Sequence, residues 1–112
     1  MNWDEKKIVL NYFQSIYLKE KKYGIFVILN TMYAKNKAIK KYDKLSINDR
    51  ESILKRIIVD YLIDKSSKSL VLYNVHSNAN RRLLRLKELM YHKYDSMSSI
   101  EREIIYNKIL HN

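Results

Sequence analysis

The scarcity of turn-forming residues is the strongest constraint on the fold of this chain. Its 112 residues include no proline and a single glycine, Gly24. A sheet needs such residues at its hairpins, whereas helices joined by short polar loops need few of them. The composition therefore argues against a β architecture. We predict an all-α fold, a small bundle of about five helices that forms a single helical domain over residues 1–112.

The first helix has clear start and stop signals. Asn2 and Glu5 have the spacing of a capping box, and apolar side chains then recur at helical spacing as far as Tyr17. We expect this helix to end near Lys22, because Gly24 can adopt the left-handed conformation that terminates helices.

The second and third helices are predicted from longer windows. Residues 25–29 are apolar and partly β-branched, which also suits a strand, but apolar residues keep helical spacing over 25–41, so we favour a helix there. A third helix is expected to start at Ser46, with Asp49 three residues later, and to end before the polar segment 64–69.

The second half contains one ambiguous stretch. Residues 70–80 fit either one long helix or a break near Asn78, which can act as an N-cap, and a strand also stays open there. A strong helical pattern follows over about 81–92. Ser98 with Glu101 is a full capping box and predicts a last helix.

Two blocks of the chain resemble each other. Residues 41–58 and 93–110 align at an offset of 52, with eight identities in 18 positions. This pattern favours a leading helix followed by two helix–loop–helix units, roughly 25–64 and 70–110. The competing interpretation is chance similarity, because capping boxes recur and the composition is biased.

Each block also resembles the first helix of the region-4 domain of bacterial sigma factors and related phage regulators, over about ten residues. The sequence departs from that family after each block: a Ser/Lys segment follows the first in place of a tight glycine turn, and the sequence ends at Asn112 after the second. We therefore carry over no DNA-recognition residue. The matching positions are Leu45, Ser46, Asp49, Arg50, Glu51 and Ile53, then Met97, Ser98, Glu101, Arg102, Glu103 and Ile104.

The chain is strongly basic. Its 22 Lys and Arg exceed its 12 Asp and Glu, which gives a net charge of +10. Lys, Ile, Asn and Tyr, all with A/T-rich codons, make up 50 of the 112 residues, so part of the lysine excess reflects codon usage and indicates an A/T-rich genome, phage or plasmid. The remaining charge favours a polyanionic partner.

An arginine cluster is the sharpest candidate site. Arg81, Arg82 and Arg85 lie within five positions, and Lys87 follows, although only six arginines occur in the chain. The planar guanidinium suits phosphates and carboxylates. The alternative is a solvated helix face opposite neighbouring leucines.

Lysines and tyrosines form two further candidate surfaces. Lysines gather toward the end of the second predicted helix, where the helix dipole also favours positive charge. Two tyrosines beside the basic residues could stack on bases or anchor an interface, or could simply line the edge of the core. The lysines are Lys35, Lys37, Lys40, Lys41 and Lys44, and the tyrosines are Tyr42 and Tyr94.

Catalytic and metal chemistry is not expected. The chain has no cysteine, its three histidines lack metal-ligand spacing, and one glycine cannot build a phosphate-binding loop. We predict no enzyme activity, no metal and no cofactor. The sequence shows no signal peptide and no apolar run approaching the roughly 20 residues of a membrane span, which favours the cytoplasm.

The leading functional hypothesis is a small nucleic-acid-binding accessory or regulatory protein of phage or plasmid type, which contacts phosphates of DNA or RNA. The alternative is a protein-interaction module, an inhibitor or immunity-type helical bundle whose basic face meets an acidic protein or, less favoured, a peripheral membrane surface. A homodimer is a further arrangement that the sequence allows.

Overall fold

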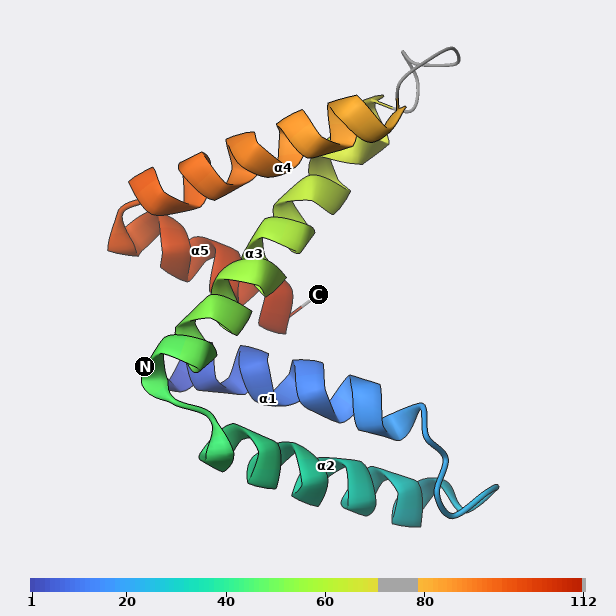
Figure 1. The fold of residues 1–112 in the computed structure, drawn as a ribbon. Helices are drawn as coiled ribbons and strands as arrows, with labels where there is room; N and C mark the ends of the chain where they lie inside the picture. Colours follow the sequence, from blue (N-terminus) through green and yellow to red (C-terminus); the bar gives the residue numbers. More distant parts are fainter. Residues whose placement is uncertain (71–78, 112) are drawn as a thin grey trace. The chain divides into compact units, whose positions relative to one another are not determined.

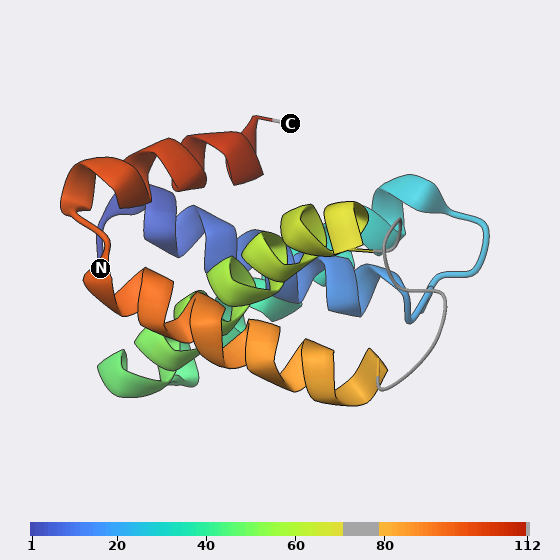
Figure 2. The same cartoon turned by 90° about the horizontal axis from the view of Figure 1, so that it is seen from above.

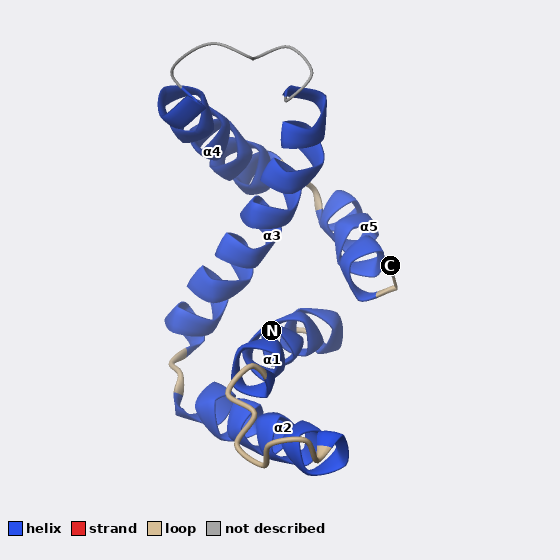
Figure 3. Cartoon of the chain, turned by 90° about the vertical axis from the view of Figure 1, so that its right-hand side faces the viewer, coloured by secondary structure: helices blue, strands red, loops and turns tan. Residues whose placement is uncertain are grey.

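The computed structural model describes residues 1–70 and 79–111, and within these residues the chain forms helices and loops without a strand (Figures 1 and 3). The predicted all-α class with about five helices is confirmed. The sequence left one long helix, a break near Asn78 and a strand open over residues 70–80, and residues 71–78 lie outside the described residues. The helices are α1 (Trp3–Leu18), α2 (Val27–Lys44), α3 (Ile47–Leu70), α4 (Ala79–Ser96) and α5 (Ser99–Leu110).

The contacts divide the chain into two compact units. The N-terminal unit is Met1–Leu54 and the C-terminal unit is Lys55–Asn112, so α3 contributes its first turns to one and the remainder to the other. The single domain expected over residues 1–112 stays a prediction.

In the N-terminal unit, α1 begins with the predicted capping box. The Asn2 side chain accepts a hydrogen bond from the Glu5 N–H at 2.8 Å, and the Glu5 carboxylate accepts one from the Asn2 N–H at 3.1 Å. Such a cap stabilises a helix by about 1 kcal/mol.

The end of α1 differs from the prediction. The helix ends at Leu18 with Lys19 as its C-cap, several residues before Lys22. Lys21 has a positive φ of 47°, which a helical residue cannot adopt, and Gly24, at φ 61°, lies in the turn beyond. Gly24 is therefore a loop residue and not the helix cap.

The core of the N-terminal unit lies between α1 and α2, which pack side by side (Figures 1 and 2). Ile8, Val9 and Phe13 of α1 are buried. The buried stripe of α2 includes Ala34 and Ala38, which are at most 1% exposed. Because the distance between helix axes depends on the side chains at the contact, these two alanines allow α1 and α2 to approach closely.

Helix α3 starts as predicted and ends later than predicted. The Ser46 hydroxyl accepts a hydrogen bond from the Asp49 N–H at 3.1 Å. The helix then continues to Leu70, so residues 64–69, which the sequence assigned to a loop, are helical. That segment is polar but contains no glycine or proline, and the helix propensities of Ser, Asp and Lys are unfavourable by only a few tenths of a kcal/mol each.

The C-terminal unit combines the rest of α3 with α4 and α5. Half of the predicted capping box of α5 is present: the Ser98 hydroxyl accepts a hydrogen bond from the Glu101 N–H at 3.2 Å, while the Glu101 carboxylate accepts from the Ser98 hydroxyl and not from the Ser98 N–H. Helix α4 runs through the segment predicted as helical but extends further, from Ala79 to Ser96. The buried apolar residues of this unit are Ile58, Val59, Leu62, Tyr94, Ile105 and Tyr106.

The two similar sequence blocks occupy equivalent structural positions. The bounds of α2 and α4 differ by 52 residues at both ends, and the starts of α3 and α5 differ by the same number. Each pair forms a helix–loop–helix element, as the sequence repeat suggests. Whether the equivalence arose by duplication stays a prediction.

Candidate functional site

The arginine cluster lies in the first two turns of α4. Arg81, Arg82 and Arg85 are exposed, as is Lys87 in the following turn. No ion pair joins these arginines to a carboxylate of the described residues. Their guanidinium groups are therefore available to an external anion.

The position of this cluster on α4 is electrostatically unfavourable for folding. The N-terminal end of a helix carries the positive end of its dipole, so a cation there costs about 0.3–1 kcal/mol. The first turns of α1, α3 and α5 contain acidic residues, whereas those of α2 and α4 contain none. A bound anion would lie near both the arginines and the helix dipole, and would offset this cost.

The lysines of α2 lie in the N-terminal unit, apart from the arginine cluster in chain order. Lys35 and Lys40 are exposed, and so are Lys41 and Lys44 in the last turn. The negative end of the helix dipole favours these last two lysines, so their positions have a structural explanation that the arginines lack. Lys37 is half-buried.

Lys37 is engaged within the chain. Its Nζ donates to both Glu20 carboxylate oxygens at 3.2 Å and to the Tyr33 hydroxyl at 2.9 Å, and the Tyr33 hydroxyl donates to Glu20 Oε2 at 2.7 Å. The hydrogen bond from Tyr33, and then the Lys37 ammonium, hold the pKa of Glu20 below its ordinary value. The Tyr33 hydroxyl, and then Glu20, raise the pKa of Lys37. Lys37 is thus the α2 lysine least available to a partner.

This network predicts a pH-dependent contribution to stability. A carboxyl group whose pKa is lowered by folding stabilises the fold above its unfolded-state pKa, and this contribution is lost as the pH falls through the folded-state pKa. Glu20→Gln should therefore lower the urea midpoint at pH 7 and have a smaller effect near pH 2.5. Urea titrations at both pH values test this, with the exposed Glu51→Gln as control. An equal effect of Glu20→Gln at both pH values would contradict the assignment.

Tyr42 and Tyr94 are not surface residues. The sequence placed them among the contact residues, but the structure buries them, at 4% and 7% exposure. Each ring is covered by an arginine from the following helix: the Arg50 guanidinium lies 4.1 Å from the Tyr42 ring centroid, and that of Arg102 lies 4.4 Å from Tyr94. Neither ring can stack on a nucleotide base in this arrangement.

The same arginines also bond the backbone at the helix junctions. Arg50 Nε donates to the Tyr42 carbonyl oxygen at 3.1 Å, and Arg102 Nη2 donates to the Tyr94 carbonyl oxygen at 2.9 Å. We call these two arrangements the Tyr–Arg corners. They explain why the sequence blocks repeat Tyr, Ser and Arg at fixed spacing: the tyrosine fills the junction, the serine caps the next helix and the arginine joins the two helices.

One surface feature was missed by the sequence analysis. Four consecutive apolar side chains, which we call the apolar tip, lie at the loop between α1 and α2 and in the first turn of α2. The available signal was the run itself, since consecutive residues on a helix of 3.6 residues per turn cannot all face one core. The exposed fractions are 90% for Ile25, 62% for Phe26, 73% for Val27 and 76% for Ile28.

The described residues contain neither a metal-binding cluster nor a membrane-spanning helix. Within residues 1–70 and 79–111, no group of three His, Asp or Glu side chains is placed to hold a metal ion, and His76 lies outside the described residues. No helix in this part of the chain has the length and apolar character needed to cross a membrane.

Comparison with known proteins gives no family assignment. No protein-family model, no curated protein and no solved structure matches the chain. The functional inference therefore rests on the chain's own residues.

Proposed function

We propose that this protein binds nucleic acid, DNA or RNA, through phosphate contacts made by the exposed arginines of α4. The observation that carries the proposal is the position of Arg81, Arg82 and Arg85. All three are exposed and have no carboxylate partner among the described residues, and Arg81 and Arg82 lie in the first turn, where positive charge does not favour folding. Arginine forms bidentate hydrogen bonds to phosphate oxygens, which suits such a role.

The distribution of charge supports the same proposal. Each unit contains 11 Lys and Arg against six Asp and Glu, a net charge of +5 per unit. Both units therefore share the excess, which favours a polyanionic partner without distinguishing α4 from the rest of the chain. Affinity would come mainly from the release of counterions condensed on the nucleic acid, which makes binding strongly dependent on salt.

This proposal predicts a defined salt response. Fluorescence anisotropy should detect binding to a labelled duplex or single strand at about 50 mM salt, with affinity falling steeply as salt rises. Arg82→Ala/Arg85→Ala should weaken binding several-fold. It should also make the plot of log K against log salt shallower by about 0.9 for each lost contact to duplex phosphate.

A matched control separates this site from general charge. Lys7→Ala/Arg56→Ala removes the same number of positive charges at exposed positions outside the proposed site, and should change affinity less than the α4 variant. Equal losses in the two variants would place binding in the overall charge and not on α4. No binding of DNA or RNA at about 50 mM salt, where phosphate contacts are favoured, would contradict the proposed function.

A further inference from the structure

A loop held by internal hydrogen bonds exposes the apolar tip to solvent. Asn30 is buried, at 6% exposure, and its side chain spans the turn: its Nδ2 donates to the Gly24 carbonyl oxygen at 2.9 Å, and its Oδ1 accepts from the Tyr23 N–H at 2.7 Å. The Phe26 N–H donates to the Tyr23 carbonyl oxygen at 3.2 Å. These bonds fix the turn and satisfy several of its backbone polar groups internally.

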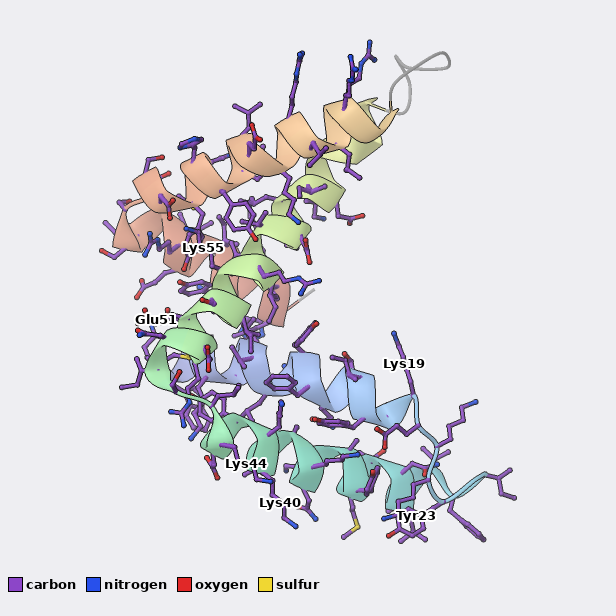
Figure 4. All side chains as sticks on the ribbon, viewed as in Figure 1. Lys19, Tyr23, Lys40, Lys44, Glu51 and Lys55 are labelled. Carbon is purple, nitrogen blue, oxygen red and sulfur yellow. The ribbon has the colours of Figure 1, made fainter. Side chains whose placement is uncertain are left out.

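Three lysines, with Glu20 between them, precede the apolar tip in the chain. Lys19, Lys21 and Lys22 precede it and are exposed, and Figure 4 shows Lys19 and Tyr23 on this loop. From residue 21 to residue 42 the chain contains six lysines and no acidic residue. The positive end of the α2 dipole also lies at the tip. The first turn of α2 contains no acidic residue and no side-chain cap that would offset it.

An open groove includes two side chains of the apolar tip. It has a volume of about 500 Å³, and its lining combines Ile25 and Val27 with Lys21. The tip thus borders a surface that pairs apolar contact with a lysine side chain.

The charges indicate which partner fits. A second copy of this chain would bring the same lysines to the contact, and like charges would oppose association. Nucleic-acid bases stack on aromatic platforms, and the tip has one aromatic ring, Phe26, among aliphatic side chains. A bilayer with anionic lipids offers an apolar layer for adjacent aliphatic side chains and phosphates for the lysines around them.

We propose that the α1–α2 loop is a membrane-insertion element, which places Ile25, Phe26, Val27 and Ile28 in the boundary between headgroups and acyl chains of an anionic bilayer. Lys19, Lys21 and Lys22 would contact the lipid phosphates. The contact is peripheral, because only the tip enters the apolar layer. The proposal is independent of nucleic-acid binding by α4 and uses different residues in the other unit.

The test is sedimentation with vesicles of phosphatidylglycerol and phosphatidylcholine at low salt, compared with vesicles of phosphatidylcholine alone. Wild-type protein should bind the anionic vesicles preferentially, and Ile25→Asp/Phe26→Asp should bind them at least tenfold more weakly. The matched control is Ile47→Asp/Ile100→Asp. These isoleucines are 68% and 71% exposed, and the first turns of α3 and α5 tolerate Asp because of the helix dipole. The control changes charge equally and should retain binding within about twofold of the wild type.

A second measurement reports insertion directly. The chain has one tryptophan, Trp3, so Trp3→Phe/Phe26→Trp places the only indole on the apolar tip. Its fluorescence should shift to the blue with anionic vesicles and be quenched by lipids brominated on their acyl chains. Circular dichroism of each variant establishes that the helices are retained.

Three outcomes would overturn the proposal. The first is wild-type protein that ignores anionic vesicles at low salt. The second is equal loss of binding in the tip and control variants, which would assign binding to general charge. In the third, the wild-type protein is a dimer, and Ile25→Asp/Phe26→Asp converts it to a monomer without changing vesicle binding. The tip variant should keep wild-type affinity for nucleic acid, and Arg82→Ala/Arg85→Ala should keep insertion, so failure of one proposal is distinguishable from failure of the other.

Discussion

Tyr42→Ala should lower the free energy of unfolding by about 3–5 kcal/mol, the cost of removing a buried aromatic side chain that leaves a cavity behind. The ring is 4% exposed and lies under the Arg50 guanidinium. Its removal would take away packing at the helix junction and the cation–π contact together. Tyr94→Ala should cost a similar amount, because Tyr94 occupies the equivalent corner beneath Arg102.

Urea denaturation monitored by circular dichroism measures the loss of unfolding free energy in both variants. Tyr12→Ala is the appropriate control, since this tyrosine is 37% exposed and its truncation should cost clearly less. If both corner variants unfold at the wild-type urea concentration, the tyrosines do not support the junctions. Tyr42→Phe and Tyr94→Phe, which keep the ring beneath the arginine, should retain most of the stability.

Enlarging the alanines of α2 should be the second severe change. Ala34→Leu and Ala38→Leu each insert a larger side chain between α1 and α2, where almost no surface is exposed. Overpacking of this kind costs about 1–3 kcal/mol per site. Because a small domain is stable by only about 5–15 kcal/mol, the double variant should be severely destabilised.

The thermal midpoint of each leucine variant measures this effect. Asn36→Leu, at an exposed position of the same helix, should leave the midpoint unchanged or raise it slightly, since leucine is the better helix former. If Ala34→Leu and Ala38→Leu both keep the wild-type thermal midpoint, α1 and α2 do not approach closely at these positions.

The features that could be predicted from the sequence are mainly those determined by nearby residues. The caps at Asn2, Ser46 and Ser98 each use a bond to the backbone three residues later, so their signature is contained in four positions. The caps depend little on the rest of the chain. The all-α class is predictable for a different reason, because the lack of turn residues is a property of the whole composition.

The errors lie where local preferences are weak or where the environment decides. Residues 64–69 look like a loop by composition, yet a few tenths of a kcal/mol per residue do not stop α3. Helix α1 ends before Lys21, whose φ is positive, and so does not extend to Gly24, the residue expected to terminate it. The burial of Tyr42 and Tyr94 depends on arginines from the next helix, which composition cannot place over a ring.

The candidate site was only partly predictable. The exposure of Arg81, Arg82 and Arg85 agrees with the expectation that the arginines form a surface cluster. The sequence predicted a helical stretch from about residue 81, but it did not decide whether this stretch starts there or continues a longer helix, because residues 70–80 fit both. The apolar tip was missed because a run of apolar residues is usually taken as core, and which of them face solvent depends on where α2 begins and on the Asn30 bonds that hold the turn.

The Tyr–Arg corners also have a kinetic consequence. Each joins residues only eight positions apart in the chain, so little loop-closure entropy is lost when a corner forms. Proteins dominated by such local contacts fold in microseconds to milliseconds. We expect the corners to be early folding nuclei, each assembling from its own short stretch of chain before the longer-range packing of α1 on α2 is complete.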